Sequence, residues 1–402
     1  MKKIAIIGAG AAGLMAAITA ARAGADVTLF ERNAEAGKKI LASGNGRCNI
    51  INTQSGIDDF YGENPEFVRD ALAAMPFQAF RDFCETIGLL LTEKSDGKCY
   101  PLSNEAKSVQ SAFVRAAKNE GVTFVYGRLI DGVASTHGKF RIGETVFDRL
   151  ILCSGSAAAP QLGGNTSGLD IARSFGHTVI EPFPSLVGLH LSHPALAAIS
   201  GVKCDARLTL FIDKKKHGDE GGDVLFTRYG ISGFAVLDTS HEASRACRDG
   251  HDVSVEIDLL PKLHAQSLTA RITKMAKTLE HTSIYDLMCG IVSHKLVRPL
   301  LKDAGVEPER ACTALDAKTV RSIVHTIKQW RFDVTGTHGF KHAEVAGGGV
   351  NTYEIDAATM QSYLVPGLYF AGEMLDVTGK RGGFNFHFAW GSGFLAGKHA
   401  AG

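Results

Sequence analysis

Three glycines near the start of the chain have the spacing that binds the pyrophosphate of a dinucleotide. They belong to Gly8-Ala9-Gly10-Ala11-Ala12-Gly13, which follows the apolar run Lys3–Ile7 and reads G-x-G-x-x-G. The first glycine allows a turn that a Cβ would block, the second lets the backbone approach a pyrophosphate, and the third lets a helix pack closely on a strand. The start of that helix presents free N–H groups and a positive dipole end to the phosphates.

An acidic residue stands at the distance where such a unit binds ribose. Asp26–Phe30 is typical of a second strand, and it ends at Glu31. A carboxylate at that place can accept both hydroxyls of the adenosine ribose, and it repels the 2′-phosphate of NADP. The order of strand, glycine turn, helix, strand and acid therefore predicts a βαβ unit that suits FAD or NAD better than NADP.

The same N-terminal stretch imitates a signal peptide or a membrane span, because it is apolar from Ile4 to Ala23. Three glycines near its start, with Arg22 and Asp26 near its end, fit a buried strand and helix better. We therefore expect neither secretion nor membrane insertion, and we expect a cytoplasmic protein.

The composition limits the classes of partner. The 402 residues suffice for two or three domains, and 43 Lys and Arg stand against 42 Asp and Glu, so overall charge gives no reason to expect nucleic acid or an anionic membrane. The basic run Lys214–His217 is local and predicts a solvated hairpin tip. The eight cysteines form no C-x-x-C pair and no ligand cluster, which predicts reduced thiols, no zinc or other metal, and no redox dithiol.

The first part of the chain alternates helical and strand patterns. Helical periodicity covers Glu66–Met75, Phe77–Ile87 and Ser108–Asn119. Strand patterns cover Thr123–Tyr126, Gly132–Ser135, Lys139–Ile142 and Arg149–Cys153. The last of these strands enters the turn Ser154-Gly155-Ser156, as is common where a dinucleotide-binding half closes.

The pattern changes between residues 187 and 332. Alternating segments at Arg207–Ile212, Val224–Thr227 and Val253–Leu259 predict a barrel-like part over 187–260. Helical segments at Leu263–Leu279, Ile284–Ala304 and Asp316–Trp330 occupy 261–332. The chain then returns to α/β patterns with a buried strand at Leu368–Glu373 and a closing helix at Phe388–Ala401. We therefore predict a cofactor domain in two parts, 1–186 and 333–402, interrupted by an inserted domain at 187–332.

Four segments together resemble the aminoacetone-oxidase-like flavoproteins, a bacterial family of FAD-binding, NAD(P)/FAD-dependent oxidoreductases. They are Gly37–Asn49, Leu152–His177, Gly222–Gly233 and Ala346–Gly397, and the last contains Ala371-Gly372-Glu373-Met374-Leu375-Asp376 and Gly382-Gly383-Phe384-Asn385. This resemblance implies an α/β fold: a glutathione-reductase-like FAD-binding Rossmann domain with an inserted domain that is β-barrel-like and then helical.

The chain departs from that family near the expected flavin face. Ser154-Gly155-Ser156-Ala157-Ala158 stands where two glycines and a Ser-x-Pro are expected, and Phe234 stands where a proline is expected. Phe384, Phe386 and His387 replace the usual Tyr, Leu and Gln. These differences bear on the identity of the substrate more than on FAD binding.

The loop Ser43–Asn49 can lay backbone N–H groups and the Arg47 guanidinium along a pyrophosphate or the flavin ring. The alternative is that Arg47 caps the end of a helix. The pKa of Cys48 could fall beside Arg47, but a small buried thiol is the commoner state of a free cysteine, and we assign Cys48 no catalytic role.

The acids near the C-terminus complete the expected cofactor site. Glu373 follows an apolar strand, where such domains place an acid on the ribityl hydroxyls, and Asp376 could serve instead or in addition. The helix that follows Asn385 would stabilise negative charge at the N1 and O2 edge of reduced flavin with its N-terminal end. The expected cofactor-binding residues are Gly8, Ala9, Gly10, Ala12, Gly13, Glu31, Arg32, Lys39, Ser43, Gly44, Arg47, Cys48, Asn49, Leu129, Ser154, Gly155, Gly372, Glu373, Asp376, Gly383, Phe384, Asn385 and Phe386.

Charged side chains beside the glycine motifs are candidates for binding a substrate. Arg381 and Lys380 could hold an anionic or carbonyl-bearing substrate. Arg228 and Tyr229, in a tight turn of the insert, could face the flavin from the other side. A solvated or core position is the alternative for each.

His338 and His387 could carry protons, because histidine titrates near neutral pH. With fifteen histidines in the chain, one near a site by chance would be unsurprising. The catalytic candidates are Arg228, Arg381 and His387.

One dinucleotide motif is visible, so NAD(P)H would dock only transiently. We predict an FAD-dependent oxidoreductase, NAD(P)H-linked or an oxidase, that transfers electrons between flavin N5 and a small-molecule substrate. The alternative is an FAD-binding protein that senses or interacts without turnover. A tRNA-modifying flavoenzyme is disfavoured by the balanced charge and the missing basic stripe, so we expect no nucleic-acid and no membrane partner.

Overall fold

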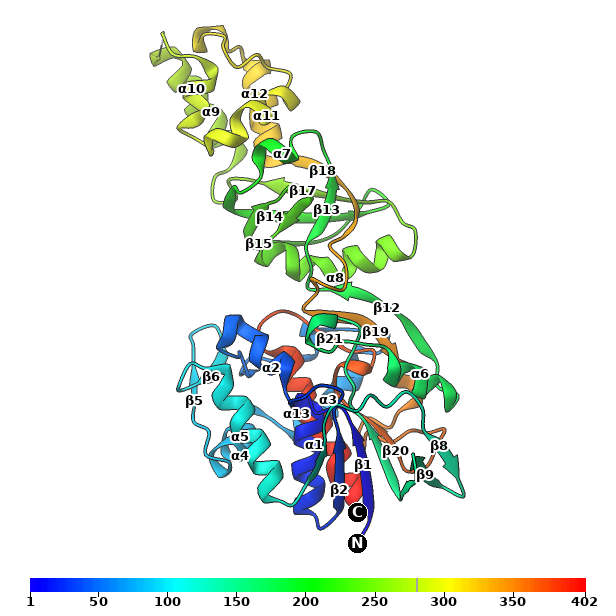
Figure 1. The fold of residues 1–402 in the computed structure, drawn as a ribbon. Coiled ribbons are helices and arrows are strands. Elements are labelled where there is room, and N and C mark those ends of the chain that lie inside the picture. Colours follow the sequence, from blue (N-terminus) through cyan, green and yellow to red (C-terminus); the bar gives the residue numbers. More distant parts are fainter. Residues whose placement is uncertain (280) are drawn as a thin grey trace. The chain divides into compact units, whose positions relative to one another are not determined.

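The computed structural model describes residues 1–279 and 281–402, which divide into two compact units (Figure 1). Unit 1 contains Met1–Phe183 and Glu344–Gly402, and unit 2 contains Pro184–Ala343. Each unit has its own cluster of buried apolar side chains. Unit 1 is therefore built from the two ends of the chain, and unit 2 from the segment between them.

The centre of unit 1 is a five-stranded sheet in the order β20-β11-β1-β2-β7, with all neighbours parallel. Its strands are β1 (Lys3–Ile7), β2 (Asp26–Phe30), β7 (Thr123–Val125), β11 (Arg149–Leu152) and β20 (Leu368–Phe370). The chain continues from β1 to β2 on one side, and β11 occupies the other side. The carboxyl ends of β1 and β11 thus form the switch point where open α/β sheets bind their ligands.

Small residues let two long helices pack closely beside this sheet. A Cβ built on Gly393 would lie 2.4 Å from the Ala12 oxygen, and one on Gly397 would lie 2.4 Å from the Ala16 oxygen. These contacts join α1 (Ala11–Arg22) to α13 (Phe384–Ala401). Helix α13 begins four residues earlier than the sequence pattern predicted, so the predicted start at Phe388 is wrong; Gly383, at φ +100°, starts the helix instead.

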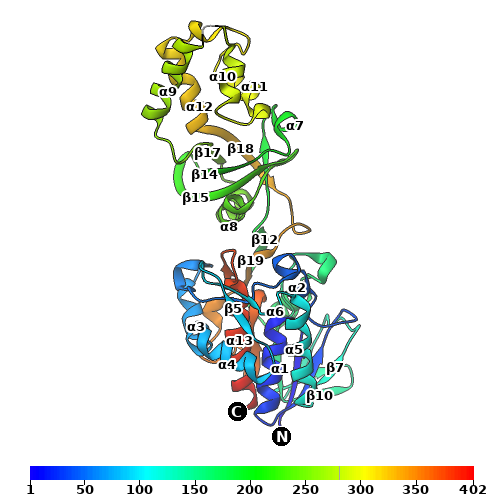
Figure 2. The ribbon, with the colours of Figure 1, turned by 90° about the vertical axis from the view of Figure 1, so that its left-hand side faces the viewer.

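The other helices and strands of unit 1 surround this core. Figure 2 shows α5 beside α1. The helices are α2 (Lys38–Ala42), α3 (Val68–Ala74), α4 (Phe77–Thr86), α5 (Ala106–Asn119) and α6 (Ser167–Ser174). The strands are β3 (Ile51–Asn52), β4 (Phe60–Tyr61), β5 (Leu91–Glu93), β6 (Lys98–Pro101), β8 (Ala134–Thr136), β9 (Lys139–Ile142), β10 (Thr145–Phe147), β12 (Val179–Ser185), β19 (Val345–Val350) and β21 (Thr378–Gly379).

Unit 2 contains a closed barrel in the order β13-β16-β15-β14-β17-β18. The strands are β13 (Leu189–Ser192), β14 (Lys203–Ile212), β15 (Lys215–Phe226), β16 (Gly230–Ser232), β17 (Val253–Asp258) and β18 (Trp330–Thr337). The helices are α7 (Leu196–Ile199), α8 (Phe234–Arg248), α9 (Ala265–Thr278), α10 (Ile284–Cys289), α11 (His294–Asp303) and α12 (Ala317–Lys328). The predicted fold class, an FAD-type Rossmann domain with a barrel and a helical region inserted, is confirmed.

Two predicted elements of the chain differ from the structure. The single helix predicted over Ile284–Ala304 is wrong, because Gly290 ends α10 and α11 starts only at His294. The strand predicted over Leu368–Glu373 stops at Phe370, where the chain enters the 3₁₀ turn Gly372–Met374. In the part of the chain that the structure describes, no helix is long and apolar enough to cross a bilayer.

Three histidines are buried and hydrogen-bonded in the two cores. In unit 1, His177 contacts Glu354 Oε2 at 3.0 Å and Ser362 Oγ at 2.8 Å. Burial lowers its pKa, lowers the pKa of His387 to about 4 and, in unit 2, lowers the pKa of His241 to about 3. At neutral pH these rings are uncharged in the folded protein.

We expect the protein to lose stability as the pH falls below about 6.5, the pKa of histidine in an unfolded chain. The unfolded chain then binds protons that the buried rings do not, so each ring lowers the free energy of unfolding by up to about 1.4 kcal/mol per pH unit until its folded pKa is reached. Denaturant unfolding between about pH 7 and pH 5 measures this slope. His387→Gln should reduce the slope, whereas the exposed control His137→Gln should leave it unchanged; equal slopes would contradict the assignment.

Candidate functional site

The three glycines after β1 have different surroundings. Gly8 has φ +102°, and a Cβ on it would lie 2.4 Å from the Cys153 oxygen. A Cβ on Gly13 would lie 1.8 Å from the Gly8 oxygen, so α1 packs directly on the turn. Within the described residues, no heavy atom lies within 4 Å of a Cβ built on Gly10. The turn is therefore closely packed on two sides and open at Gly10.

The N-terminus of α1 is open to a ligand at this same place. Gly10 is the N-cap, and among the residues described no side chain caps this end of the helix. The first N–H groups of a helix have no intrahelical partner and carry the positive end of its dipole. Uncapped N–H groups beside an open glycine can donate hydrogen bonds to a pyrophosphate. The residues present at this place therefore fit a dinucleotide cofactor.

Glu31 is buried at the end of β2, with 7% of its surface exposed. Its Oε2 accepts a hydrogen bond from Ala9 N at 3.0 Å, and its Oε1 accepts from Asn33 N at 2.8 Å and from Asn33 Nδ2 at 2.7 Å. Because each carboxylate oxygen has two lone pairs, Oε2 keeps one site for a ribose hydroxyl, and Oε1 is filled. Two ribose hydroxyls would require Asn33 to release Oε1.

The segment after β7 runs beside Glu31. Gly127 N donates to Asn33 O, and Arg128 N donates to Glu31 O, both at 3.0 Å. This pairing places Leu129, which is 50% exposed, next to the ribose-binding end, where an apolar side chain suits an adenine ring. Arg32, also exposed, donates to Gly163 O at 3.4 Å.

The loop Ser43–Asn49 contains several residues in the left-handed region, among them Asn45 at φ +55° and Cys48 at φ +58°. Such conformations in residues other than glycine are uncommon and gather at ligand sites. Arg47 is exposed, donates from Nε to Gly44 O at 3.2 Å and lies over the Tyr100 ring. The contact with Gly44, which lies in a 3₁₀ helix, uses Nε alone, and a cofactor-binding role for Arg47 stays a prediction.

Cys48 is fully buried in this loop. Burial raises its pKa to about 12, so the thiol stays protonated at neutral pH. The fall in pKa considered for a cysteine beside Arg47 does not occur, because burial outweighs the hydrogen bond with Ser43 that lowers the pKa. A thiol in this state is not a nucleophile.

Glu373 contacts helix α2, the loop after β11 and strand β19. Its Oε2 contacts Lys39 Nζ at 2.8 Å, and its Oε1 accepts from Ser156 Oγ at 2.6 Å and from Ala346 N at 3.2 Å. Gly155, at φ +76°, is close enough that a Cβ would lie 3.9 Å from Oε2. Glu373 therefore orients Lys39, the one cation in this group, at the edge where α1 begins.

The N-terminus of α13 meets the glycine-rich loop. A Cβ on Gly383 would lie 2.9 Å from Asn49 Oδ1 and 2.8 Å from the Ile51 oxygen. Asn49 Oδ1 is buried and, among the described residues, has no hydrogen-bond partner. An unpaired buried acceptor beside an uncapped helix end suits the N–H and carbonyl edge of a flavin pyrimidine ring.

Other predicted residues near α13 have partners in the protein. Asp376 Oδ2 accepts from Glu63 N at 2.8 Å, and the Asn385 amide binds Gly379 N at 2.8 Å and Gly379 O at 2.7 Å. Phe384 packs edge-on against Phe60. These contacts shape the turn before the helix, and a direct role in cofactor binding stays a prediction.

Four more predicted residues, one of them in α13, also have contacts within the protein. Ser154 Oγ lies 4.0 Å from Met374 Sδ, and Ser43 Oγ donates to Ile40 O at 2.7 Å. Gly372, at φ +73°, donates its N–H to Ser392 Oγ at 3.0 Å. Phe386 stacks on Trp390 with ring centroids 5.8 Å apart.

The catalytic candidates of unit 1 differ in exposure. His387 is 4% exposed, donates from Nε2 to Met75 O at 2.9 Å and is neutral at pH 7. Arg381 is half-buried, directly before Gly382 and Gly383. Lys380 pairs with Asp59 at 3.5 Å. His387 Nδ1 is buried and has no hydrogen-bond partner among the described residues. A catalytic role for His387 or Arg381 stays a prediction.

In unit 2, Arg228 is exposed in a turn closed by a 2.8 Å bond from Thr227 N to Gly230 O. Its neighbour Tyr229 stacks on His338 with ring centroids 3.9 Å apart. His338 Nδ1 lies 3.0 Å from His190 Nε2. Sequence reasoning missed His190, because no local pattern marks a pair separated by 148 positions. A catalytic role for Arg228 stays a prediction.

Among the described side chains, no group of three or more His, Cys, Asp or Glu could hold a metal ion.

Two glycine substitutions separate binding from folding. Gly10→Ala should change the free energy of unfolding by less than about 1 kcal/mol, because its Cβ has open space, yet lower dinucleotide affinity about 10- to 100-fold by filling that space. Gly13→Ala should destabilise the fold by about 2–4 kcal/mol. Denaturant unfolding and cofactor titration of both variants measure this; a Gly10→Ala protein with unchanged affinity would exclude the open face as the binding surface.

The chain is similar to a known protein family and to relatives of known activity. The model of the HI0933-like protein Rossmann domain matches residues 2–399. The 3-dehydro-bile acid delta(4,6)-reductase of Clostridium scindens is 33% identical over 407 residues, covering 100% of this chain and 99% of that protein. The ribosomal RNA dihydrouridine synthase of Escherichia coli is 32% identical over 399 residues, covering 96% and 95%.

A solved structure has the same fold. The 3-ketosteroid delta1-dehydrogenase from Sterolibacterium denitrificans matches with a TM-score of 0.50 and 13% identity over 100% of both chains. The aminoacetone-oxidase-like label is not confirmed by these comparisons. Because the family model spans nearly every residue and relatives above 30% identity cover the chain almost end to end, the chain belongs to the HI0933-like Rossmann family.

Proposed function

We propose that this protein binds FAD and reduces a carbon–carbon double bond conjugated to a carbonyl group. The observation that carries the cofactor assignment is the open, uncapped N-terminus of α1 at Gly10, beside the buried carboxylate of Glu31. The reaction class is supported by the names of two relatives that match the chain over nearly their whole length.

The reactions named for these two relatives belong to one chemical class. A delta(4,6)-reductase acting on a 3-dehydro compound reduces ring double bonds conjugated to a 3-keto group, and a dihydrouridine synthase saturates the ring double bond of uridine. In both substrates a carbonyl polarises the alkene, so a hydride adds to the carbon far from the carbonyl and a proton adds to the near carbon. An electron-poor alkene is thus the common feature of both reactions.

Different residues of unit 1 would bind different parts of the cofactor. The N–H groups of α1 and the Lys39 ammonium would hold the pyrophosphate, and Glu31 would accept a ribose hydroxyl. Asn49 Oδ1 and the N-terminus of α13 would meet the pyrimidine edge, where the helix dipole stabilises negative charge. When bound, reduced FAD supplies the hydride from its N5 position.

Arg381 is the residue that we assign to the substrate carbonyl. It directly precedes the Gly382–Gly383 turn that starts α13, so its positive charge belongs to the same end of the site as the pyrimidine edge. A cation beside the carbonyl oxygen stabilises the negative charge that develops there when hydride adds to the alkene. The reductant that we propose is NAD(P)H, docked transiently.

Two substrates fit this reaction class: a steroid-like dienone and a uracil base in RNA. The balanced charge of the chain, 43 basic against 42 acidic residues, favours the smaller one. We also test the uracil base, because relatives of this chain are ribosomal RNA dihydrouridine synthases, although the sequence led us to expect no nucleic-acid partner. Oxidation of aminoacetone, an amine, is the alternative that the resemblance to aminoacetone-oxidase-like flavoproteins implies. A further alternative is that the protein binds FAD without catalysing a reaction.

Anaerobic stopped-flow absorbance tests the proposal. Holoprotein reduced by NAD(P)H should be reoxidised by a 3-keto-4,6-diene steroid acid or by a uridine-containing oligonucleotide, but not by the saturated 3-ketone control. Arg381→Ala should slow reoxidation about 100-fold and leave FAD affinity unchanged, as for loss of one oxyanion donor; Arg381→Lys should retain part of the rate. Reoxidation by none of these alkenes would refute the reductase, and flavin reduction by aminoacetone would replace it with an amine oxidase.

A further inference from the structure

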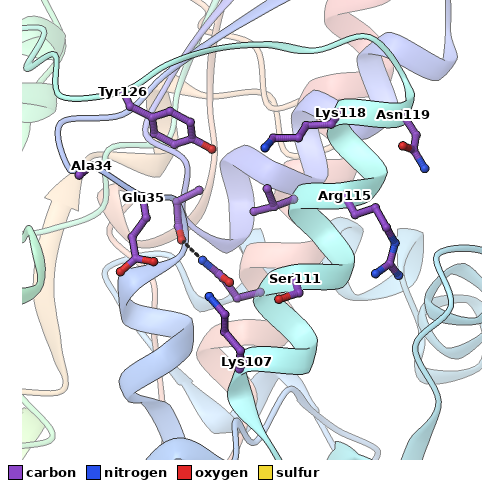
Figure 3. A pocket seen from close by; sticks show the side chains of 11 residues that line it. Ala34, Glu35, Lys107, Ser111, Arg115, Lys118, Asn119 and Tyr126 are labelled. Carbon is purple, nitrogen blue, oxygen red and sulfur yellow. Dashed lines mark hydrogen bonds between the residues drawn. The ribbon is translucent and has the colours of Figure 1, made fainter.

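A pocket of about 580 Å³ lies on unit 1, apart from the cofactor residues described above (Figure 3). One wall is a stripe of α5, and the opposite wall is the loop Ala34–Ala36 with Tyr126, which follows β7. Protein interiors and helix contacts are normally filled to crystal-like density. A hollow of this volume lies within the range of small-molecule sites, about 300–1,000 Å³.

The α5 wall presents two lysines, a serine and a valine on one helix face. Lys107, Ser111, Val114 and Lys118 follow the spacing i, i+4, i+7 and i+11, so their side chains form one row. The neighbouring face of α5, which includes Val109 and Phe113, is fully buried. The row is therefore the edge of α5 that the core does not cover.

The row contains two lysines, Lys107 and Lys118. Among the ion pairs of the described residues, none contains Lys107 or Lys118. Arg115 differs, because its Nη2 donates to Ile87 O at 2.8 Å and its side chain points away from the pocket in Figure 3. Glu35 is the acidic residue of the lining.

The two ends of the pocket differ in charge. In Figure 3 the Lys118 ammonium and the Tyr126 hydroxyl point toward each other at one end, while Lys107 and Glu35 occupy the other. An ammonium and a hydroxyl donor suit a phosphate monoester. A lysine with a carboxylate suits a polar, uncharged body that both donates and accepts hydrogen bonds, such as a ribose.

We propose that this pocket binds the phosphate monoester of a nucleotide-sized ligand, with the phosphate on Lys118 and Tyr126 and the sugar between Lys107 and Glu35. The phosphate is that of a free nucleotide or the 2′-phosphate of a nicotinamide dinucleotide. This inference is independent of the reductase chemistry, and it takes from the proposed function only that FAD fills the site at Gly10.

The pocket shares a loop with the cofactor site. Gln110 Nε2, in the α5 wall, donates to Ala36 O at 2.9 Å, the contact drawn as a dashed line in Figure 3. The next residue, Gly37, donates its N–H to Ala9 O at 2.9 Å, and Ala9 N is bonded to Glu31. A ligand that contacts Ala34–Ala36 therefore favours the conformation of the turn that binds the pyrophosphate, and by linkage FAD should strengthen its binding equally.

Isothermal titration of the FAD-loaded protein tests the site. Inorganic phosphate, AMP and NADP⁺ are the probes, and adenosine and NAD⁺ are the matched ligands without a phosphate monoester. We expect saturable binding of AMP or NADP⁺, and binding of adenosine and NAD⁺ that is at least about tenfold weaker, as for loss of the charge-assisted phosphate contact. Binding of AMP alone would identify a free nucleotide, and binding of NADP⁺ alone a dinucleotide 2′-phosphate. Lys118→Gln should weaken binding about tenfold, as for one charge-assisted contact.

The controls separate this site from the cofactor site. Lys94→Gln removes an exposed lysine outside the pocket and should leave the affinity unchanged. Tyr126→Phe should weaken binding about threefold while FAD content stays full. No binding by phosphate, AMP or NADP⁺, or equal binding by their matched controls, would overturn the proposal. Loss of binding in Lys118→Gln together with loss of FAD would also overturn it, because the effect would then belong to the cofactor site.

Discussion

The close contact between the start of α1 and the turn after β1 is the constraint on which the candidate site depends. A Cβ on Gly13 would collide with the Gly8 oxygen at 1.8 Å, so the helix can pack there only without one. This contact points the uncapped N–H groups of α1 past Gly10 and across the switch point between β1 and β11. Glu31 then fixes the turn through Ala9 N. The phosphate-binding end and the ribose-binding end are thus held by a few backbone contacts.

The parts of the site that are local in sequence could be predicted. The spacing of Gly8, Gly10 and Gly13 gives the turn, the helix start and the packing contact, because each depends on residues within one βαβ unit. The barrel could be predicted only as a barrel-like insert, because alternating segments show strands but not their order. The hairpin tip predicted at Lys214–His217 is centred on Asp213 and Lys214, both at positive φ, since a two-residue turn of this kind requires it.

Contacts between distant residues could not be predicted. Glu373 and Lys39 are separated by 334 positions, and their pairing brings helix α2 to the 3₁₀ turn that follows β20. The sequence predicts Glu373 as a ligand for ribityl hydroxyls, which stays a prediction, but it gives no sign of the bonds to Lys39, Ser156 and Ala346. No sequence motif marks the pocket beside α5, because neither the face of α5 nor the loop Ala34–Ala36 has a distinctive pattern by itself. Proximity, not residue type, creates both features.

The most direct test of the account is the identity of the cofactor released by the purified protein. Acid denaturation followed by chromatography of the supernatant distinguishes FAD from FMN and from nicotinamide dinucleotides. The account predicts a yellow protein that releases FAD in a stoichiometry near one per chain, since Gly10, the α1 N-terminus and Glu31 fit a pyrophosphate and an adenosine ribose, which FMN lacks. Release of FMN alone, or failure of the apoprotein to bind FAD, would contradict it.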